Sequence, residues 1–388
     1  MKIFNFSQKF QKVFFVDPMS YNNLAEYDYK LLTGYLPANF KVYFFGNTKY
    51  NLNSTPKKTR LIFNYSNYSN KILKMISYII SWLKVFFFSI FIRPDIIHIQ
   101  WLKVPQFDYW MICLMKLFSP NRKIIFTAHN ILPHNSGKKH FETFQNIYSK
   151  IDHIIIHTFI SKSELIDEFR ISPSKLTVIP HGLLSMEYDN NIANSFIEKY
   201  NNKFELKDKL VFLMIGGIST YKGVDILLDA WNDEEKGLKS KKDCLLIIAG
   251  KGDIDYQKPI ADNCIIINKF LTNEEFIALI EIGDIIVFPY RKISQSGVLL
   301  TVLSKHKPIC VTPVGGLTEP FEIGEIGWIS KSTECKDLIQ ILNEIYTSKN
   351  KIDEIKNNKE LWKKIDTYYD WKKISKQTYN LYKNLLLS

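Results

Sequence analysis

Short runs of β-branched and aromatic residues alternate with stretches of helical periodicity along most of the chain. The runs are apolar at successive positions, which is typical of parallel strands that helices cover on both faces. The pattern predicts an α/β fold built on parallel sheets. We expect seven strands in the first half and five in the second, at residues 12–16, 41–45, 60–64, 95–100, 123–127, 154–157 and 177–179, then 211–216, 244–249, 264–267, 285–288 and 308–312.

A polar interval at residues 187–209 separates the two series of strands. The second series reopens with a strand, a turn and a helix, so we expect two Rossmann-like domains, at residues 1–190 and 191–370, facing each other across a cleft. Residues 371–388 have the periodicity of an amphipathic helix. This segment is predicted to pack back towards the first domain.

Composition agrees with two globular domains, since 388 residues with 46% hydrophobic and 23% charged residues can bury two cores. The five cysteines are far apart and form no CxxC pair, which favours a reducing compartment over a disulfide framework. Residues 1–16 lack the continuous apolar core of a signal peptide. We therefore expect a cytoplasmic protein.

The net charge of +12 favours an anionic partner, which could be nucleic acid, anionic lipid or a phosphate-bearing substrate. The lysines are dispersed and no groove-reading motif is present, so nucleic acid is not expected. Residues 71–93 form an apolar segment with basic ends, interrupted by Lys84. This favours a core helix or a helix lying on an anionic membrane over a true span, and we expect peripheral contact with the inner face of the cell membrane.

Glycine-rich and polar turns follow four strands of the second half, where ligands bind in open α/β sheets. Glycines let a phosphate approach the backbone, a lysine supplies charge, and a helix start offers free N–H groups. A plain turn with a solvated lysine is the alternative at the first of them. The candidate nucleotide-sugar-binding residues are Gly216, Gly217, Ser219, Lys222, Gly250, Gly252, Tyr290, Arg291, Gln295, Ser296, Gly297, Val298, Gly315, Gly316 and Glu319.

Two candidate catalytic residues follow strands of the first half. Asp17 comes directly after the first strand, and His129 follows the strand at residues 123–127. A single histidine is more often structural, but its place at a strand's carboxyl end favours a functional role. The spacing of His129, His134 and His140 is not a metal-binding signature. His181 follows the last strand of this half.

The segments IFTAHNILPH, VIPHG, YKGVDILLDAW, LLIIAGKGD, VFPYRKISQSGVLL and KPICVTPVGGLTE together resemble family-four glycosyltransferases of the GT-B fold, which build bacterial surface polysaccharides. The resemblance implies that the second domain binds a GDP- or UDP-linked sugar and the first a saccharide or polyprenyl-linked acceptor. It also implies that Lys222 touches the donor diphosphate, that the helix start at Ser296 and Gly297 cradles it, and that His129 contacts the transferred sugar.

The chain departs from the family pattern at two places. The two glutamates seven residues apart are missing, with Ser294 or Gln295 and then Thr301 or Val302 in their regions. The phosphate-binding arginine is also missing, with Gly217 and Ser219 at its possible positions. The SQSGV sequence resembles a sub-branch of the family that lacks the first glutamate, so we expect an active enzyme of that branch.

We expect transfer without a cofactor or metal, because no DxD pair follows a strand and Lys222, Arg291 and the helix start can stabilise the leaving diphosphate. With retention, the leaving phosphate takes the acceptor proton; with inversion, a carboxylate acts as base, and the candidates are Asp17, Glu26, Asp28 and Glu142. Glu26 and Asp28 read alternatively as a solvated helix start. Other classes are a nucleotide-sugar epimerase, a phosphorylase, a catalytically silent scaffold and an exported binding protein.

Overall fold

The computed structural model describes residues 10–132, 139–253 and 256–387. It divides into two compact units, residues 1–182 together with 369–388, and residues 183–368. Residues 183–190 therefore belong to the second unit, whereas the sequence analysis places them in the first. Each unit contains one parallel sheet.

The sheet of the first unit has the strand order β3-β2-β1-β4-β5-β6-β7, and every neighbouring pair is parallel. The core strands carry Val, Ile and Phe at successive positions because both faces are covered. The strands are β1 (Gln11–Val16), β2 (Phe40–Asn47), β3 (Thr59–Phe63), β4 (Ile96–Ile99), β5 (Lys123–Thr127), β6 (His153–Ile156) and β7 (Leu176–Val178).

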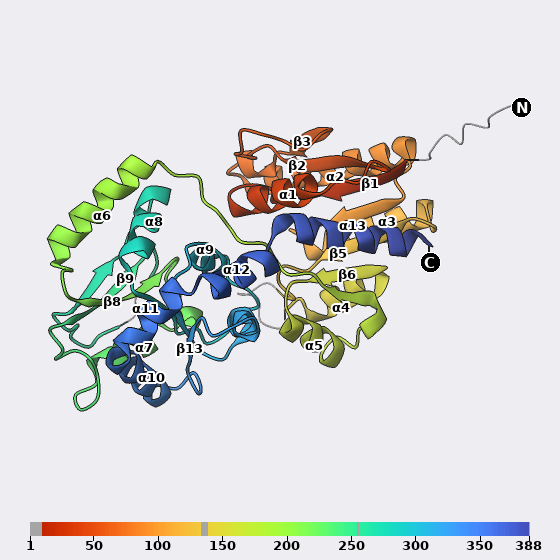
Figure 1. The fold of residues 1–388 in the computed structure, drawn as a ribbon. Coiled ribbons are helices and arrows are strands. Elements are labelled where there is room, and N and C mark those ends of the chain that lie inside the picture. The colour runs from red at the N-terminus through yellow and green to blue at the C-terminus, as the bar shows by residue number, and fades with distance from the viewer. Residues whose placement is uncertain (1–9, 133–138, 254–255, 388) are drawn as a thin grey trace, which may run out of the picture. The chain divides into compact units, whose positions relative to one another are not determined.

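Different helices cover the two faces of this sheet. One face packs against α2 (Lys71–Ile92), α3 (Pro105–Phe118), α4 (Phe141–Lys150) and α5 (Phe159–Asp167). The other face packs against α1 (Asn23–Gly34) and α13 (Trp371–Leu387). The last helix of the chain, blue in Figure 1, thus completes the core of the first unit and packs against α1.

The sheet of the second unit has the order β10-β9-β8-β11-β12-β13 and is also parallel. Its strands are β8 (Leu210–Ile215), β9 (Cys244–Ala249), β10 (Cys264–Ile267), β11 (Ile285–Phe288), β12 (Ile309–Val311) and β13 (Gly327–Ile329). Its helices are α6 (Asn190–Phe204), α7 (Val224–Asn232), α8 (Asn273–Ile282), α9 (Gly297–Ser304), α10 (Cys335–Thr347), α11 (Lys349–Asn357) and α12 (Lys359–Tyr368).

All twelve predicted strands are present, and the two Rossmann-like sheets confirm the predicted fold class. The sequence analysis missed β13, which pairs with β12 over three residues. Gly327 begins β13 with φ of 153°, and a Cβ there would lie 1.8 Å from the Ile309 carbonyl oxygen. The run is too short, and too dependent on a glycine, to stand out as a strand.

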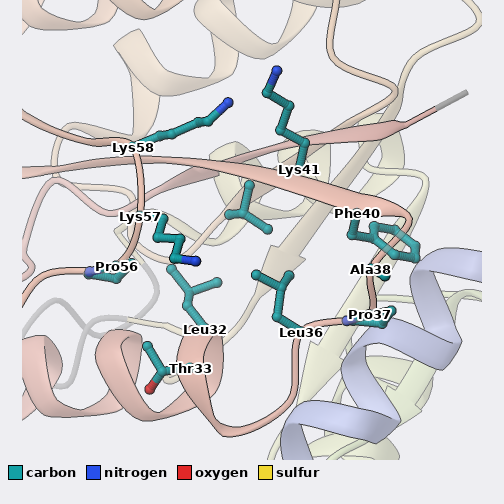
Figure 2. A pocket seen from close by; sticks show the side chains of 11 residues that line it. Leu32, Thr33, Leu36, Pro37, Ala38, Phe40, Lys41, Pro56, Lys57 and Lys58 are labelled. Carbon is teal, nitrogen blue, oxygen red and sulfur yellow. The ribbon is translucent and has the colours of Figure 1, made fainter.

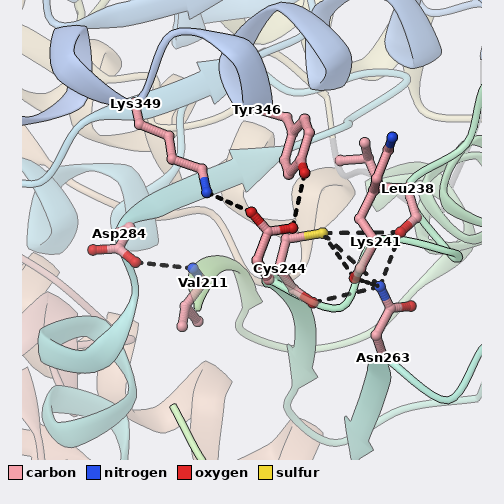
Figure 3. A network of polar contacts seen from close by, with 9 residues as sticks. Val211, Leu238, Lys241, Cys244, Asn263, Asp284, Tyr346 and Lys349 are labelled. Carbon is pink, nitrogen blue, oxygen red and sulfur yellow. Dashed lines mark hydrogen bonds and ion pairs between the residues drawn. The ribbon is translucent and has the colours of Figure 1, made fainter. Parts of the chain in front are cut away.

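Polar contacts connect neighbouring segments at the amino ends of the strands in the second unit (Figure 3). Asp243, just before β9, accepts from Lys349 Nζ at 2.7 Å and from the Tyr346 hydroxyl at 2.8 Å. Asp284, just before β11, accepts from the Val211 backbone N–H at 2.9 Å. These carboxylates have their hydrogen-bond partners within the unit, so we interpret the contacts at this edge of the sheet as stabilising the fold.

Candidate functional site

The turns after β8 and β9 lie against each other at the carboxyl edge of the second sheet. Ile218 and Gly252 form an isolated parallel bridge beyond the ends of these strands. A Cβ on Gly250, whose φ is 148°, would lie 2.0 Å from the Gly216 carbonyl oxygen. Glycine is therefore required where these two turns meet. Gly217 is exposed, and a Cβ there would meet only the Lys251 carbonyl oxygen, at 3.8 Å.

The turns after β11 and β12 join the same edge through backbone contacts. The Arg291 N–H donates to the Tyr221 carbonyl oxygen at 2.7 Å, which ties the turn after β11 to the turn after β8. The Gly316 N–H donates to the Ser294 carbonyl oxygen at 3.0 Å, which ties in the turn after β12. The structure thus brings together all four turns that the sequence singles out.

Lys222 is the buried cation of this edge. It ends a short 3-10 helix (Thr220–Lys222), and its side chain is 9% exposed. Its Nζ lies 5.5 Å from the centroid of the Tyr290 ring and 3.3 Å from the position that a Cβ on Gly216 would occupy. Among the residues that the structure describes, no carboxylate pairs with it. Burial lowers the pKa of Lys222 to about 8, because its charge has lost most of its hydration.

Two further polar atoms beside Lys222 are buried without a hydrogen-bond partner, the Ser219 Oγ and the Tyr290 hydroxyl. The helix α9 starts at the same place. The Ser296 Oγ accepts from the Leu299 N–H at 3.3 Å, and a Val298 methyl group lies 3.0 Å from the position of a Cβ on Gly216. Buried polar groups are normally bonded, so these two hydroxyls make the cluster a candidate binding site.

Arg291 has partners other than those expected from the sequence. Its guanidinium binds both oxygens of Asp225, at 2.7 and 2.6 Å, and donates to the Thr220 carbonyl oxygen. This pairing lowers the pKa of the Asp225 carboxyl. Arg291 thus braces the lysine turn. Glu319 begins a 3-10 helix (Glu319–Glu322), and Gln295 is partly exposed before α9.

In the first unit, two buried carboxyl groups meet after β1. Asp17 is 1% exposed and Asp28, on α1, is fully buried, so the alternative of a solvated helix start is wrong for Asp28. The two carboxyl groups are buried neighbours, but Asp17 Oδ2 and both Asp28 oxygens have no hydrogen-bond partner among the described residues, while Asp17 Oδ1 accepts from the Met19 N–H at 2.7 Å. Burial raises the pKa of Asp17 to about 7 and holds the pKa of Asp28 well above its usual range, with the Asp17 charge adding to the second effect.

Tyr27 lies among aromatic rings at this edge. Its ring centroid is 4.8 Å from those of His129 and His181, and 5.4 Å from that of Trp371 at the start of α13. Trp101 stacks on His129 with centroids 5.2 Å apart and planes 2° apart. The indole N–H of Trp101 is buried without a partner.

A chain of hydrogen bonds fixes the ring nitrogens of His129. His157 Nδ1 donates to the Ile179 carbonyl oxygen at 2.8 Å, and burial lowers the pKa of His157 to about 4. The neutral ring therefore accepts at Nε2 from His129 Nδ1, 3.2 Å away. His129 is also neutral, since burial holds its pKa well below the usual value. Its Nε2 lies 3.2 Å from Gln100 Oε1, so it accepts a hydrogen bond only when the Gln100 amide is turned to present its nitrogen to the ring.

The chain continues to the C-terminal helix. With the Gln100 amide turned in this way, its oxygen replaces its nitrogen 2.9 Å from His98 Nε2 and accepts from that nitrogen, which also lies 2.7 Å from Thr127 Oγ1. Burial lowers the pKa of His98 to about 3, so its Nδ1 accepts from the Tyr382 hydroxyl at 2.6 Å. Every bond from Tyr382 to Ile179 has one donor and one acceptor, which holds His129 in a single tautomer and orientation.

Other candidates in the first unit lie outside this cluster. Glu26 pairs with Lys30 at 2.6 Å, Glu142 is exposed on α4, and His140 precedes α4, while His134 lies outside the described residues. The structure adds residues to the carboxyl edge of the first sheet that the sequence analysis missed. The one sequence feature that pointed to any of them was the end of a predicted strand, IIHIQW. They are Tyr27, His98, Gln100, Trp101, His157, Trp371 and Tyr382.

A hollow of about 440 Å³ lies between α1 and the amino end of β2 (Figure 2). Its walls include Leu32, Leu36 and Val42, and Lys57 reaches towards Leu32. It adjoins the start of a strand, opposite to the edge that carries the polar cluster. We do not assign it to the site.

Two family models match the chain, one to each half. A model described as Glycosyltransferase Family 4 matches residues 34–183, and one described as glycosyl transferases group 1 matches residues 209–348. The chain belongs to the GT-B glycosyltransferases of this group. The match agrees with the resemblance inferred from the sequence motifs.

Curated relatives of this family member are distant. An uncharacterized glycosyltransferase of Methanocaldococcus jannaschii is 26% identical over 235 residues, which are 57% of each chain. The GPI3 subunit of the phosphatidylinositol N-acetylglucosaminyltransferase of Saccharomyces cerevisiae is 23% identical over 68% of this chain. The chain thus spans 57 and 58% of the lengths of these two relatives.

Solved structures share the fold of this family member over nearly all of its length. Sucrose-phosphate synthase from Thermosynechococcus elongatus has a TM-score of 0.69 at 14% identity, covering 97% of this chain and 99% of its own. Anabaena HepE in complex with UDP-glucose has a TM-score of 0.67 at 15% identity, covering 96 and 99%. These likenesses establish the two-domain GT-B fold.

Proposed function

We propose that the protein transfers a hexosyl group from a nucleotide-diphosphate sugar to a saccharide or lipid-linked saccharide. The observation that carries this proposal is Lys222, a buried cation without a carboxylate partner among the described residues, where four turns meet. A diphosphate would supply the missing negative charge and would accept hydrogen bonds from the groups around Lys222. No neutral ligand would do so as well.

The leaving nucleoside diphosphate is the group that this edge stabilises in our proposal. Lys222 offsets the charge that develops on it, and the N–H groups at the start of α9 donate to its oxygens. Several structural neighbours were solved with UDP or UDP-glucose, which favours a UDP-linked donor over a GDP-linked one as the first to test. These protein groups would stabilise the diphosphate without a metal or cofactor.

The edge of the first unit would hold the acceptor and the transferred sugar. Trp101 and His129 offer a stacked aromatic surface on which a sugar ring can pack. We propose retention, in which the leaving phosphate takes the acceptor proton. Under inversion the Asp17–Asp28 pair would be the base, because its raised pKa allows it to accept a proton near neutral pH.

The setting that we propose is surface polysaccharide synthesis at the cytoplasmic face of a membrane. Its supports are the resemblance of the motifs to enzymes of that class and the net charge of +12, which suits a chain working beside anionic lipid. The acceptor would then be carried on a polyprenyl diphosphate.

The first test is a thermal-shift series with UDP, GDP, ADP and UDP-sugars, with magnesium or with EDTA. We expect a rise in Tm with one nucleotide family, equal under both conditions, since a ligand that binds only the folded state stabilises it. Lys222→Met keeps the length of the side chain and should remove the rise. Lys251→Met, an exposed lysine of the neighbouring turn, is the matched control.

Four outcomes would argue against the proposal. No shift with any nucleotide would favour a silent scaffold, and a shift that needs magnesium would end the metal-free mechanism. A shift that Lys222→Met leaves unchanged would remove Lys222 from the donor site. Conversion of a UDP-sugar to its epimer without an acceptor would identify an epimerase.

A further inference from the structure

The helix α2 is apolar on its outer face as well as on the face that packs against the core. Its buried face carries Ser77, Ser81 and Ser89, together with Tyr78 and Trp82. The Ser81 hydroxyl bonds the carbonyl oxygens of Ser77 and Ile62, so these polar groups are satisfied inside the unit. A helix whose serines face the core would be expected to show charged residues outside.

The outer face of α2 is instead almost continuously apolar. Ile72 is 69% exposed, Phe87 55% and Phe91 82%. The remaining large apolar side chains of this face are 37 to 49% exposed, and they are Leu73, Met75, Ile76, Ile80, Leu83 and Ile90. Nine exposed large apolar residues on one helix exceed the scattered few of a normal surface and mark a site of contact.

The apolar face continues from α2 onto α3. The rings of Phe86 and Phe118 lie 5.3 Å apart, which joins the two helices near their carboxyl ends. Leu117 is 77% exposed and Phe118 60%. We call the outer face of α2 together with Leu117 and Phe118 the apolar face.

The charges around the apolar face are positive. The helix α2 carries Lys71, Lys74 and Lys84, is followed by Arg93, and contains no acidic residue. The one acidic residue of α3, Asp108, is fully buried and accepts from the Tyr78 hydroxyl at 2.7 Å. A hollow of about 470 Å³ between the ends of α2 and α3 is lined by Ile90, Phe118, Arg93 and Arg122, and by Asp95.

We propose that the apolar face lies in the boundary between the headgroups and acyl chains of an anionic lipid bilayer, with α2 parallel to the membrane plane. Exposed Ile and Phe side chains would enter the acyl region, while Lys74, Lys84 and Arg93 would reach phosphate groups. This combination of apolar stripe and flanking cations matches a bilayer surface, whereas an acidic protein partner would leave the nine apolar residues unexplained.

The helix is long and apolar enough to cross a membrane, the one such helix in the described part of the chain, but only its outer face is free. The inner face holds core contacts that a lipid could not replace, such as Ser81 to the Ile62 carbonyl oxygen at 2.8 Å and Trp82, which is 1% exposed. Crossing the membrane would break these contacts and expose β3. The geometry therefore assigns the helix to the membrane surface.

The inference deepens the proposed function, because a lipid-linked acceptor would be met at that surface, but its test needs no activity. The full chain would be sedimented with phosphatidylcholine vesicles containing 30% phosphatidylglycerol (roughly the range of anionic lipid in which such electrostatic binding is seen) and with pure phosphatidylcholine vesicles. We expect the unaltered chain to bind the anionic vesicles. The double variant Ile76→Glu with Phe87→Glu should bind them at least about tenfold more weakly. Lys74→Gln with Lys84→Gln should weaken binding several-fold and reduce its dependence on anionic lipid.

The matched control is Phe270→Glu, which alters an 84% exposed phenylalanine of the second unit and should bind like the unaltered chain. Absence of vesicle binding, or equal binding by Ile76→Glu with Phe87→Glu, would overturn the proposal. The proposal would also be overturned if the chain formed a dimer without lipid and the same double variant were monomeric. That result would identify a second copy of the chain as the occupant of the apolar face. The thermal shift with nucleotide separates the two proposals, since it is expected to survive in every one of these variants.

Discussion

The carboxyl edges of the two sheets differ in the charge that their buried groups carry and in how far the chain itself bonds those groups. In the first unit, Tyr382, His98, Gln100, His129 and His157 bond one another in sequence and leave no charge. In the second unit, Lys222 and two neighbouring hydroxyls are buried without such partners. The hydrogen-bonded rings of the first edge are thus held by the chain itself, although the Trp101 indole N–H beside them is unbonded, and in our proposal a ligand completes the second edge.

The electrostatics of the two edges follow the same division. Burial keeps the four histidines of the first edge neutral, with the pKa of His181 lowered to about 3. At the second edge the pKa of Lys222 remains near 8, so this residue is charged at neutral pH although it is buried. An uncharged surface suits a sugar, and an unpaired cation suits a diphosphate.

The largest expected effect comes from removing the cation of the second edge. Lys222→Met should reduce kcat/KM by about 10²–10³, as losing one preorganised group at a developing charge does in other enzymes. Turnover would be measured as release of UDP from a UDP-sugar in the presence of acceptor. Lys251→Met is the control, and a loss below about threefold in Lys222→Met would show that the two edges do not differ as described.

The buried carboxyl pair should make the stability of the first unit depend on pH. The folded pKa of Asp17, about 7, is above its ordinary value of 3.8, so the stabilisation from its bound proton is full below pH 3.8 and is lost as pH rises through 7. We expect the free energy of unfolding to fall between pH 5 and pH 8 by at most about 3 kcal/mol.

Asp17→Asn tests this reading, because it removes the titrating carboxyl and keeps the size of the side chain. The fall in stability between pH 5 and pH 8, measured by denaturant unfolding, should be much reduced in this variant. Glu142→Gln alters an exposed carboxylate and should keep the slope of the unaltered chain. Equal slopes in all three proteins would mean that Asp17 is not the group that titrates in this pH range.

The charge of Lys222 should make donor affinity depend on pH at the second edge. Since its pKa is about 8, the charged fraction falls as pH rises through 8, and the affinity for UDP should weaken by about tenfold between pH 7 and pH 9. Calorimetric Kd values at the two pH values check this. Lys222→Arg stays charged at pH 9 and should remove the loss; an equal loss in that variant would place the titrating group elsewhere.

The second edge was the more predictable from sequence, since its parts are contiguous motifs after strands. Glycine turns, Lys222 and the helix start at Ser296 can be read one by one, and the order of parallel strands then brings them to one edge. What the sequence could not give was the pairing of Arg291. Its partner Asp225 lies 66 residues away and looks like an ordinary residue of a helix start.

The first edge was harder to predict because its members are scattered. Tyr382 and Trp371 come from the last helix and reach the edge only when α13 packs on α1. Asp28 looked solvated because it follows a helix start, and its burial depends on the β1 turn that carries Asp17. Such contacts between distant segments leave no local pattern. The strands were predictable because hydrophobic periodicity is a local pattern. The strand β13 was missed because it is too short to show such a pattern.

The smallest expected effect tests whether α13 positions His129. Tyr382→Phe removes the hydroxyl that donates to His98 Nδ1 and should lower stability by about 1–2 kcal/mol, because one buried acceptor loses its partner. It should also allow His98 to change tautomer, which frees the Gln100 amide to turn and loosens His129. The ¹⁵N shifts of the histidine rings would then show a mixture of tautomers for His129, with kcat lowered a few-fold and the nucleotide thermal shift unchanged.

Tyr379→Phe, on the same helix with a hydroxyl that bonds no described residue, is the control. If His129 kept one tautomer in Tyr382→Phe, the bonds from Gln100 and His157 alone would fix it, and α13 would be a covering helix without influence on the first edge.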